Sequence, residues 1–169
     1  MITTPLITRA EIQQYKQLSN SINNAKLNEL ILQAQMVDLY PLLGEQLYYD
    51  VINNTSDWTD LLEGVIYEYN GITYTNVGLK AVLAHYAYAR YVLYGDVIDT
   101  AFGLKAKMNN DVSEKIDYPM KKTLYEHNCN YAFNLWLNVE SYLMRNNIAK
   151  YFKCGIKSNN KNFRISRIG

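Results

Sequence analysis

Few residues in this chain have the types and spacing of a catalytic or metal-binding site. His127 and Cys129 could supply two metal ligands, but no other cluster supplies the rest at a recognisable spacing. Glu126 and His127 are adjacent, which places them on different sides of a helix rather than together as an acid–base pair. No phosphate-binding glycine loop, GxSxG or HExxH motif occurs in the sequence. We therefore expect no enzyme activity, no cofactor and no metal.

Tyrosines are concentrated in the most apolar stretch of the chain, residues 77–94, where they recur at positions 86, 88, 91 and 94. A row of aromatic side chains could stack on nucleic-acid bases. Helical spacing instead distributes these four around the axis, so packing in the core explains them better. The same stretch contains Lys80, His85 and Arg90, and we therefore expect no membrane span.

Helical signals begin close to the N-terminus. Thr8 and Glu11 have the spacing of a capping box, which predicts a short first helix. A second helix is predicted from about Asn24, where apolar residues recur at helical spacing. Pro41 lacks an amide donor and crowds the preceding turn, so we expect this helix to end near Tyr40 and the next to begin at a corner there.

The clearest local signal is the dipeptide Asn70–Gly71, which lies between two short β-branched and aromatic segments. This arrangement predicts a β-hairpin over about 65–75 with a type I′ turn. Because a lone hairpin is only marginally stable in water, it should pack on the helices or on a neighbouring chain.

A central buried helix is predicted over 77–94, followed by a long irregular connection. Pro119 should open the last helix, with Asp117 as its cap, and the helix should end near Asn146. Such a helix is on the order of 40 Å long, which is more than a domain of this size needs. Its expected buried face comprises Tyr118, Tyr125, Ala132, Trp136, Val139 and Leu143.

The charge is distributed unevenly along the chain. Residues 150–169 contain six basic residues and no acidic one, which leaves 11 basic against 16 acidic residues, a net charge of −5, in the rest. A basic tail on an acidic body requires an explanation in terms of a partner.

Three stretches, taken together, resemble one family. They are ILQAQMVDLYPLLGEQLYYDVI (31–52), LLEGVIYEYNGITYTNVGLKAVLAHYAYARYVL (61–93) and DTAFGLKAKMNNDVSEKI (99–116). In this order they are similar to the head–tail connector proteins (adaptor, ring or neck proteins) of tailed bacteriophages. The likeness is strongest to phages of Bacteroides-type gut bacteria, including crAss-like phages, and covers residues 5–146.

The resemblance implies a structural virion protein with no catalytic residue. Its expected fold is a mainly α helical bundle with a long C-terminal helix, one short β-hairpin and an extended C-terminal arm. The expected partners are further copies in a ring, twelve-fold like the portal, together with the portal protein, the next tail or neck protein, and genomic DNA passing through the channel without sequence-specific binding. The protein would be found in the neck of the virion, and in the host cytoplasm during assembly.

Two regions are expected to make these contacts. The domain boundary is predicted between a connector domain, residues 1–146, and a basic arm, residues 147–169, whose end alternates like a strand. The arm residues expected to contact the portal or a neighbouring subunit are Tyr151, Phe152, Phe163, Arg164, Ile165 and Arg167. The expected loop contacts are Asp99, Thr100, Phe102, Gly103 and Lys105.

One alternative from another functional class remains open. A nucleic-acid-binding accessory protein could use the basic tail to bind phosphates, and its affinity would then fall steeply with salt.

Overall fold

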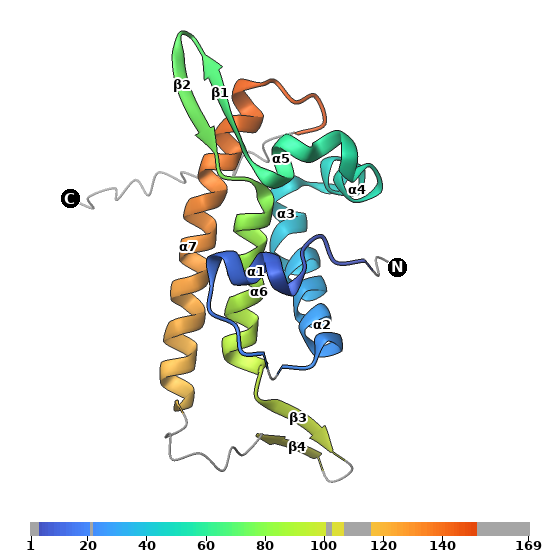
Figure 1. Ribbon diagram of the computed structural model, residues 1–169, viewed down its shortest axis with the longest axis vertical. Coiled ribbons are helices and arrows are strands. Elements are labelled where there is room, and N and C mark those ends of the chain that lie inside the picture. The colour runs from blue at the N-terminus through green and yellow to red at the C-terminus, as the bar shows by residue number, and fades with distance from the viewer. Residues whose placement is uncertain (1–3, 21, 101–102, 107–115, 152–169) are drawn as a thin grey trace, which may run out of the picture.

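The structure is a computed structural model that describes residues 4–20, 22–100, 103–106 and 116–151. Three long helices form its framework: α2 (Asn24–Ala34), α6 (Leu79–Tyr94) and α7 (Tyr118–Arg145). In Figure 1, α6 lies between α7 and α2, and it packs against both. The predicted mainly helical fold with a long last helix is confirmed.

The N-terminal segment crosses this framework through a short helix, α1 (Arg9–Tyr15). The predicted capping box is present, because the Thr8 side chain accepts from the Glu11 amide while the Glu11 carboxylate accepts from the Thr8 amide at 2.6 Å. The segment before α1 is held by Gln35, whose Oε1 accepts from the Leu6 amide at 2.7 Å.

Pro41 lies in the first turn of a helix, as predicted, but the corner predicted there is wrong, because the helical path continues through the proline. After α2 the chain forms a π-helical turn, η1 (Gln35–Leu39), and then α3 (Tyr40–Leu43). In η1 the amide of Tyr40 donates to the carbonyl of Gln35, five residues back. A widened turn of this kind relieves the crowding that a proline causes in an α-helix. The break comes instead at Gly44, whose φ of +74° suits glycine, and α4 (Glu45–Asn53) follows.

A 3₁₀ turn, η2 (Thr55–Trp58), and a short helix, α5 (Thr59–Glu63), lead into the predicted hairpin. Strands β1 (Val65–Tyr69) and β2 (Ile72–Asn76) pair antiparallel, with Tyr69 opposite Ile72. Asn70 and Gly71 have φ of +52° and +75°, as a type I′ turn requires. Both the hairpin and its turn type are therefore confirmed.

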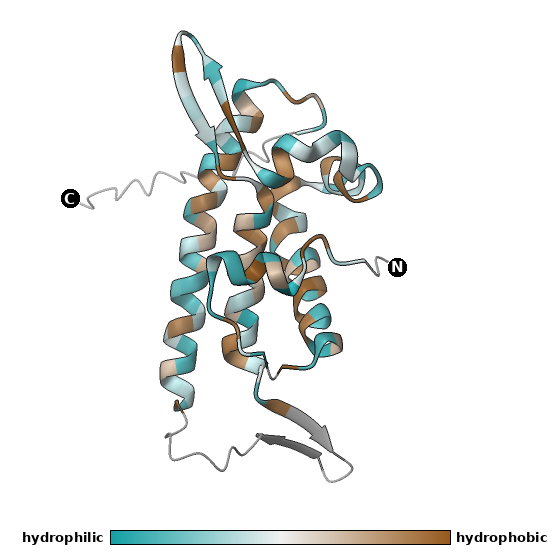
Figure 2. Ribbon diagram, in the orientation of Figure 1, coloured by the Kyte–Doolittle hydropathy of each residue, from teal (hydrophilic) through white to brown (hydrophobic). Residues whose placement is uncertain are grey.

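The core lies where α6 meets the other helices. Ten residues of α6 are buried, which confirms the predicted central helix. Around it pack Ile31 of α2, Leu47 of α4 and Trp136 of α7. Figure 2 shows apolar residues on α6 and its neighbours, and a mixture of polar and apolar residues along α7.

Helix α7 begins as predicted, because the Asp117 side chain accepts from the Met120 amide at 3.0 Å. Its predicted buried face holds for Ala132, Trp136, Val139 and Leu143. Tyr125 is only half-buried, and Tyr118 is 68% exposed, which corrects the prediction for that residue. Tyr118 lies in the first turn, beyond the reach of the core.

The connection expected to be irregular contains a second hairpin, β3 (Val97–Thr100) and β4 (Gly103–Ala106), which pair antiparallel. Figure 1 shows it at the end of the molecule opposite the β1–β2 hairpin. The Lys26 ammonium of α2 donates to the Val97 carbonyl and so ties the base of this hairpin to the helical body.

Candidate interaction surfaces

Tyr151 is the one predicted arm residue within the described part of the chain. Its hydroxyl donates to Glu140 Oε1 at 2.8 Å, and its ring lies edge-on to Trp136 with centroids 6.1 Å apart. Lys150 binds Asp50 of α4 at 2.8 Å. The first residues after α7 therefore fold back onto their own body, and any extended arm begins no earlier than residue 152. Phe152, Phe163, Arg164, Ile165 and Arg167 lie outside the described residues.

The predicted loop contacts fall on the second hairpin. The backbones of Asp99 and Thr100 belong to β3, and those of Gly103 and Lys105 belong to β4. Phe102 lies outside the described residues. The structure thus brings the backbones of four of the five together on one hairpin at one end of the molecule.

The β1–β2 hairpin is anchored by Arg145 in the last turn of α7. The guanidinium donates to the Tyr67 hydroxyl at 2.9 Å, and its carbon lies 3.8 Å from the centre of the Tyr74 ring. The Tyr67 ring also meets Tyr142 edge-on, with centroids 4.9 Å apart. The phenol hydrogen bond raises the pKa of Arg145 above its ordinary value. These contacts supply the support that a lone hairpin needs.

Asn138 of α7 fixes one edge of the same hairpin. Its side-chain amide donates to the Thr75 carbonyl at 2.9 Å, and its carbonyl oxygen accepts from the Val77 amide at 2.9 Å. The side-chain amide therefore pairs with the edge of β2 as a peptide group of a third strand would. Sequence reasoning missed both Asn138 and Arg145, because nothing in their local sequence distinguishes them from other polar helix residues.

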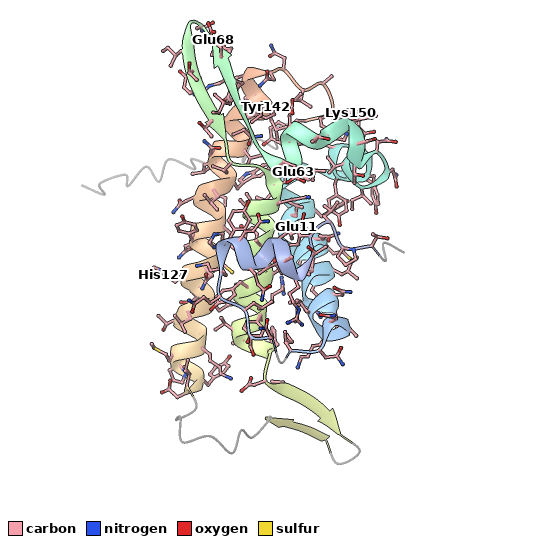
Figure 3. The ribbon with its side chains drawn as sticks, viewed as in Figure 1. Glu11, Glu63, Glu68, His127, Tyr142 and Lys150 are labelled. Carbon is pink, nitrogen blue, oxygen red and sulfur yellow. The ribbon has the colours of Figure 1, made fainter. Side chains whose placement is uncertain are left out.

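The outer part of the hairpin exposes apolar side chains. Ile66 is 70% exposed and Ile72 is 56% exposed. Figure 3 places Glu68 near the free end of the hairpin, well away from the helices. A projecting hairpin with exposed isoleucines is suited to contact another protein.

Exposed apolar side chains also mark the two flanks of the helical body. On α7, Phe133, Leu137 and Met144 are each about half exposed and follow one another at spacings of four and seven residues, so they share one side of the helix. On η1, Met36 is 54% and Val37 is 60% exposed. We call these the α7 flank and the η1 flank. Since η1 continues α2, they lie on helices that pack on either side of α6 (Figure 1).

A partly buried polar cluster lies between η1, α6 and α7, and its thiol and phenol groups are held in their protonated forms. The Arg90 guanidinium binds Asp38 Oδ2 at 2.8 and 3.1 Å. Burial raises the pKa of the Cys129 thiol, and burial also raises the pKa values of Tyr86 and Tyr125 to about 12. A protonated thiol and protonated phenols are poor nucleophiles, so the cluster suits helix packing better than catalysis.

A pocket of about 420 Å³ lies beside the N-terminal segment, lined in part by Thr55, Thr59 and Leu62. Its lining includes two charged residues, Glu63 and Lys80. The Lys80 ammonium binds Glu11 at 2.5 Å and also binds Glu63. Lys80, Glu11 and Glu63 are therefore paired with one another, and none of the three offers an unpaired group for catalysis.

The described residues contain no cluster of three or more side chains that could hold a metal ion. His127 is exposed on the outer side of α7 (Figure 3), away from the buried polar cluster. Among the same residues, no helix is both long and apolar enough to cross a bilayer.

One family model matches the chain, over residues 39–161, and it is described as a family of unknown function (DUF6712). Searches among curated proteins and among solved structures found no match.

Proposed function

The chain belongs to the DUF6712 family, and we propose that it is a structural virion protein, a ring-forming head–tail connector of a tailed phage. In this role it docks on the portal, lines the channel for the genome and joins the capsid to the tail. The proposal starts from the resemblance of residues 31–52, 61–93 and 99–116 to connector proteins.

The observation that carries the proposal is the pair of exposed apolar flanks. A ring of identical subunits is built from head-to-tail contacts, so each subunit needs two unlike surfaces on different sides. The α7 flank and the η1 flank meet this need, because they differ in sequence and lie on helices that α6 separates. The apolar side chains of both flanks are about half exposed to water in a monomer, and burying them against a neighbour would stabilise a ring.

The two hairpins suit contacts along the ring axis. They project from opposite ends of the helical body (Figure 1), where a ring subunit would meet the protein above and the protein below. The second hairpin carries four of the residues expected to contact neighbours. The net charge of −5 outside residues 150–169 also suits a channel wall, since an acidic surface repels phosphates and lets DNA pass without binding.

The test is assembly with the portal protein of the same phage. We expect side views in negative-stain images to show a ring stacked on the portal, whether or not the isolated protein is a monomer. Leu137→Arg on the α7 flank should abolish the ring. Met120→Arg is the matched control, because Met120 is similarly exposed but lies on a different side of the same helix. Failure of the wild-type protein to bind the portal or join particles would contradict the proposal.

The competing proposal is that the chain is an accessory nucleic-acid-binding protein, and the basic residues of the tail favour it. Binding through phosphates would lose orders of magnitude in affinity between about 50 and 200 mM salt. Attachment through apolar flanks should change little over this range. Tight DNA binding with a steep salt dependence, and no portal complex, would favour the alternative.

A further inference from the structure

The two edges of the β1–β2 hairpin differ. In a two-residue hairpin the pair flanking the turn exchanges hydrogen bonds, so Tyr69 and Ile72 form such a pair and Tyr67 and Tyr74 form the next. The backbone groups of Ile66 and Glu68 on one edge, and of Thr73 and Thr75 on the other, must then point outward. The contact of Asn138 with the Thr75 carbonyl agrees with this pattern.

On the β1 edge, the outward backbone groups of Ile66 and Glu68 meet no partner among the described residues. Ile66 and Glu68 also share one face of the strand, and both side chains are exposed. β1 therefore offers an open strand edge that carries an apolar side chain followed two residues later by an acidic one. Open edges of this kind bind an additional strand.

We propose that the open edge of β1 binds residues 161–167 of a neighbouring copy as a third strand. Every second residue of an extended strand lies on the same face. In this segment one face would carry Lys161, Phe163, Ile165 and Arg167. Two apolar residues with a basic residue on each side complement Ile66 and Glu68. In an antiparallel strand with Phe163 opposite Ile66, Lys161 lies opposite Glu68. In a parallel strand with Ile165 opposite Ile66, Arg167 lies opposite Glu68.

The length of the chain permits this contact. Tyr151 is fixed against Trp136 and Glu140, and nine residues separate it from Lys161. Nine extended residues span roughly 30 Å, which is the scale of a small domain. In a closed ring each tail would cover the edge of the next copy, and every copy would lose its open edge. This inference therefore rests on the proposed ring assembly.

Photo-crosslinking of the full-length chain tests the contact. Ile66→p-benzoylphenylalanine, prepared at natural isotope abundance, is mixed with ¹⁵N-labelled wild-type chain and the portal, irradiated and analysed by mass spectrometry. We expect crosslinks from position 66 to heavy peptides that contain residues 161–167. The same substitution at Thr73, on the other edge of the hairpin, is the matched control and should give few such crosslinks.

A charge exchange tests the pairing itself. Glu68→Lys should lower the crosslink yield about two- to five-fold, as expected for one cross-strand ion pair. Combining it with Lys161→Glu and Arg167→Glu should restore the yield, which a purely structural effect of Glu68→Lys would not allow.

The outcomes separate this inference from the proposed function. Rings on the portal without a crosslink from position 66 to the tail would overturn the inference and leave the connector function intact. Crosslinks only to light tail peptides would show that the tail binds its own hairpin, and crosslinks to the portal would show a different occupant; either result also overturns the inference. If no ring forms, the proposed function and this inference both fail.

Discussion

His85 illustrates how a single residue in the core is tuned by its neighbours. It is 5% exposed, its ring centre lies 4.5 Å from that of Tyr131, and its Nδ1 has no hydrogen-bond partner among the described residues. Burial, aided by the positive charge of Lys16, lowers the pKa of the imidazole from 6.5 to about 4. The folded protein therefore holds this side chain neutral at pH values where the unfolded chain protonates it.

This lowered pKa predicts a loss of stability in mild acid. Below pH 6.5 His85 binds a proton in the unfolded state but not in the folded state. The free energy of unfolding should therefore fall as the pH drops from 6.5 to 4. Above pH 6.5 it should not depend on the ionisation of His85. The expected contribution is about 1–3 kcal/mol across this window. Urea unfolding at pH 7.5, 6.0 and 5.0 measures it.

The control for this prediction is His85→Phe, which keeps an aromatic ring beside Tyr131 and cannot bind a proton. Its pH dependence should be flatter than that of the wild type by the amount above, because carboxylates such as Asp38 titrate in both proteins. Parallel curves for the two proteins would refute the assignment.

At the scale of elements, the base of the β1–β2 hairpin depends on a close crossing of two backbones. Gly64, before β1, and Gly78, after β2, have φ of +92° and +82°. A Cβ at Gly78 would lie 2.6 Å from the Leu62 carbonyl oxygen, closer than real Cβ atoms come to other atoms. Asn76 secures the same crossing, since its side chain donates to the Asp60 carbonyl at 2.8 Å and accepts from the Gly78 amide at 3.1 Å.

We expect Gly78→Asn to destabilise the fold by about 1–3 kcal/mol, because asparagine tolerates positive φ but its Cβ would displace the Leu62 backbone. Gly71→Asn is the matched control. Gly71 has φ of +75° with nothing within 4 Å of its Cβ position, so the change should stay within about 0.5 kcal/mol. Thermal and urea unfolding measure both variants. Equal effects would show that the crossing imposes no steric constraint.

The elements that could be predicted from the sequence are those set by local chemistry. The Thr8–Glu11 capping box, the Asn70–Gly71 turn and the Asp117 cap each depend on residues within a few positions of one another. The path through Pro41 could not be predicted in this way, because the π-helical turn before it is held by Arg90, which binds Asp38 from another helix. The β3–β4 hairpin was missed because its sequence has no Asn-Gly or Asp-Gly turn signal.

At the scale of the whole molecule, the surfaces that we propose bind neighbouring chains were the least predictable from the sequence. The apolar periodicity of α7 indicated its buried face, but Phe133 and Leu137 became recognisable as a flank only once their exposure was known. The open edge of β1 likewise became apparent only when Asn138 was found on the edge of β2. Which side of an element remains uncovered is decided by its neighbours in space, and sequence patterns do not contain that information.

The last prediction concerns the division between body and tail. Deleting residues 155–169 should leave the stability of the body unchanged, because the truncated chain keeps Tyr151 with its contacts to Trp136 and Glu140. It should nevertheless weaken or abolish assembly on the portal. The deletion removes four basic residues, Lys157, Lys161, Arg164 and Arg167, so the net charge changes from +1 to −3.

A second variant separates charge from strand pairing. Replacing these four residues by glutamine gives the same net charge but keeps Phe163 and Ile165, so it should retain part of the attachment that the deletion loses. Circular dichroism and thermal unfolding report on the body, and sedimentation of portal complexes reports on assembly. A truncated chain that assembles into stable, genome-filled particles as the wild type does would refute the role of the tail. If the glutamine variant lost as much attachment as the deletion, the contact would depend on charge, because the apolar residues alone would then contribute nothing measurable.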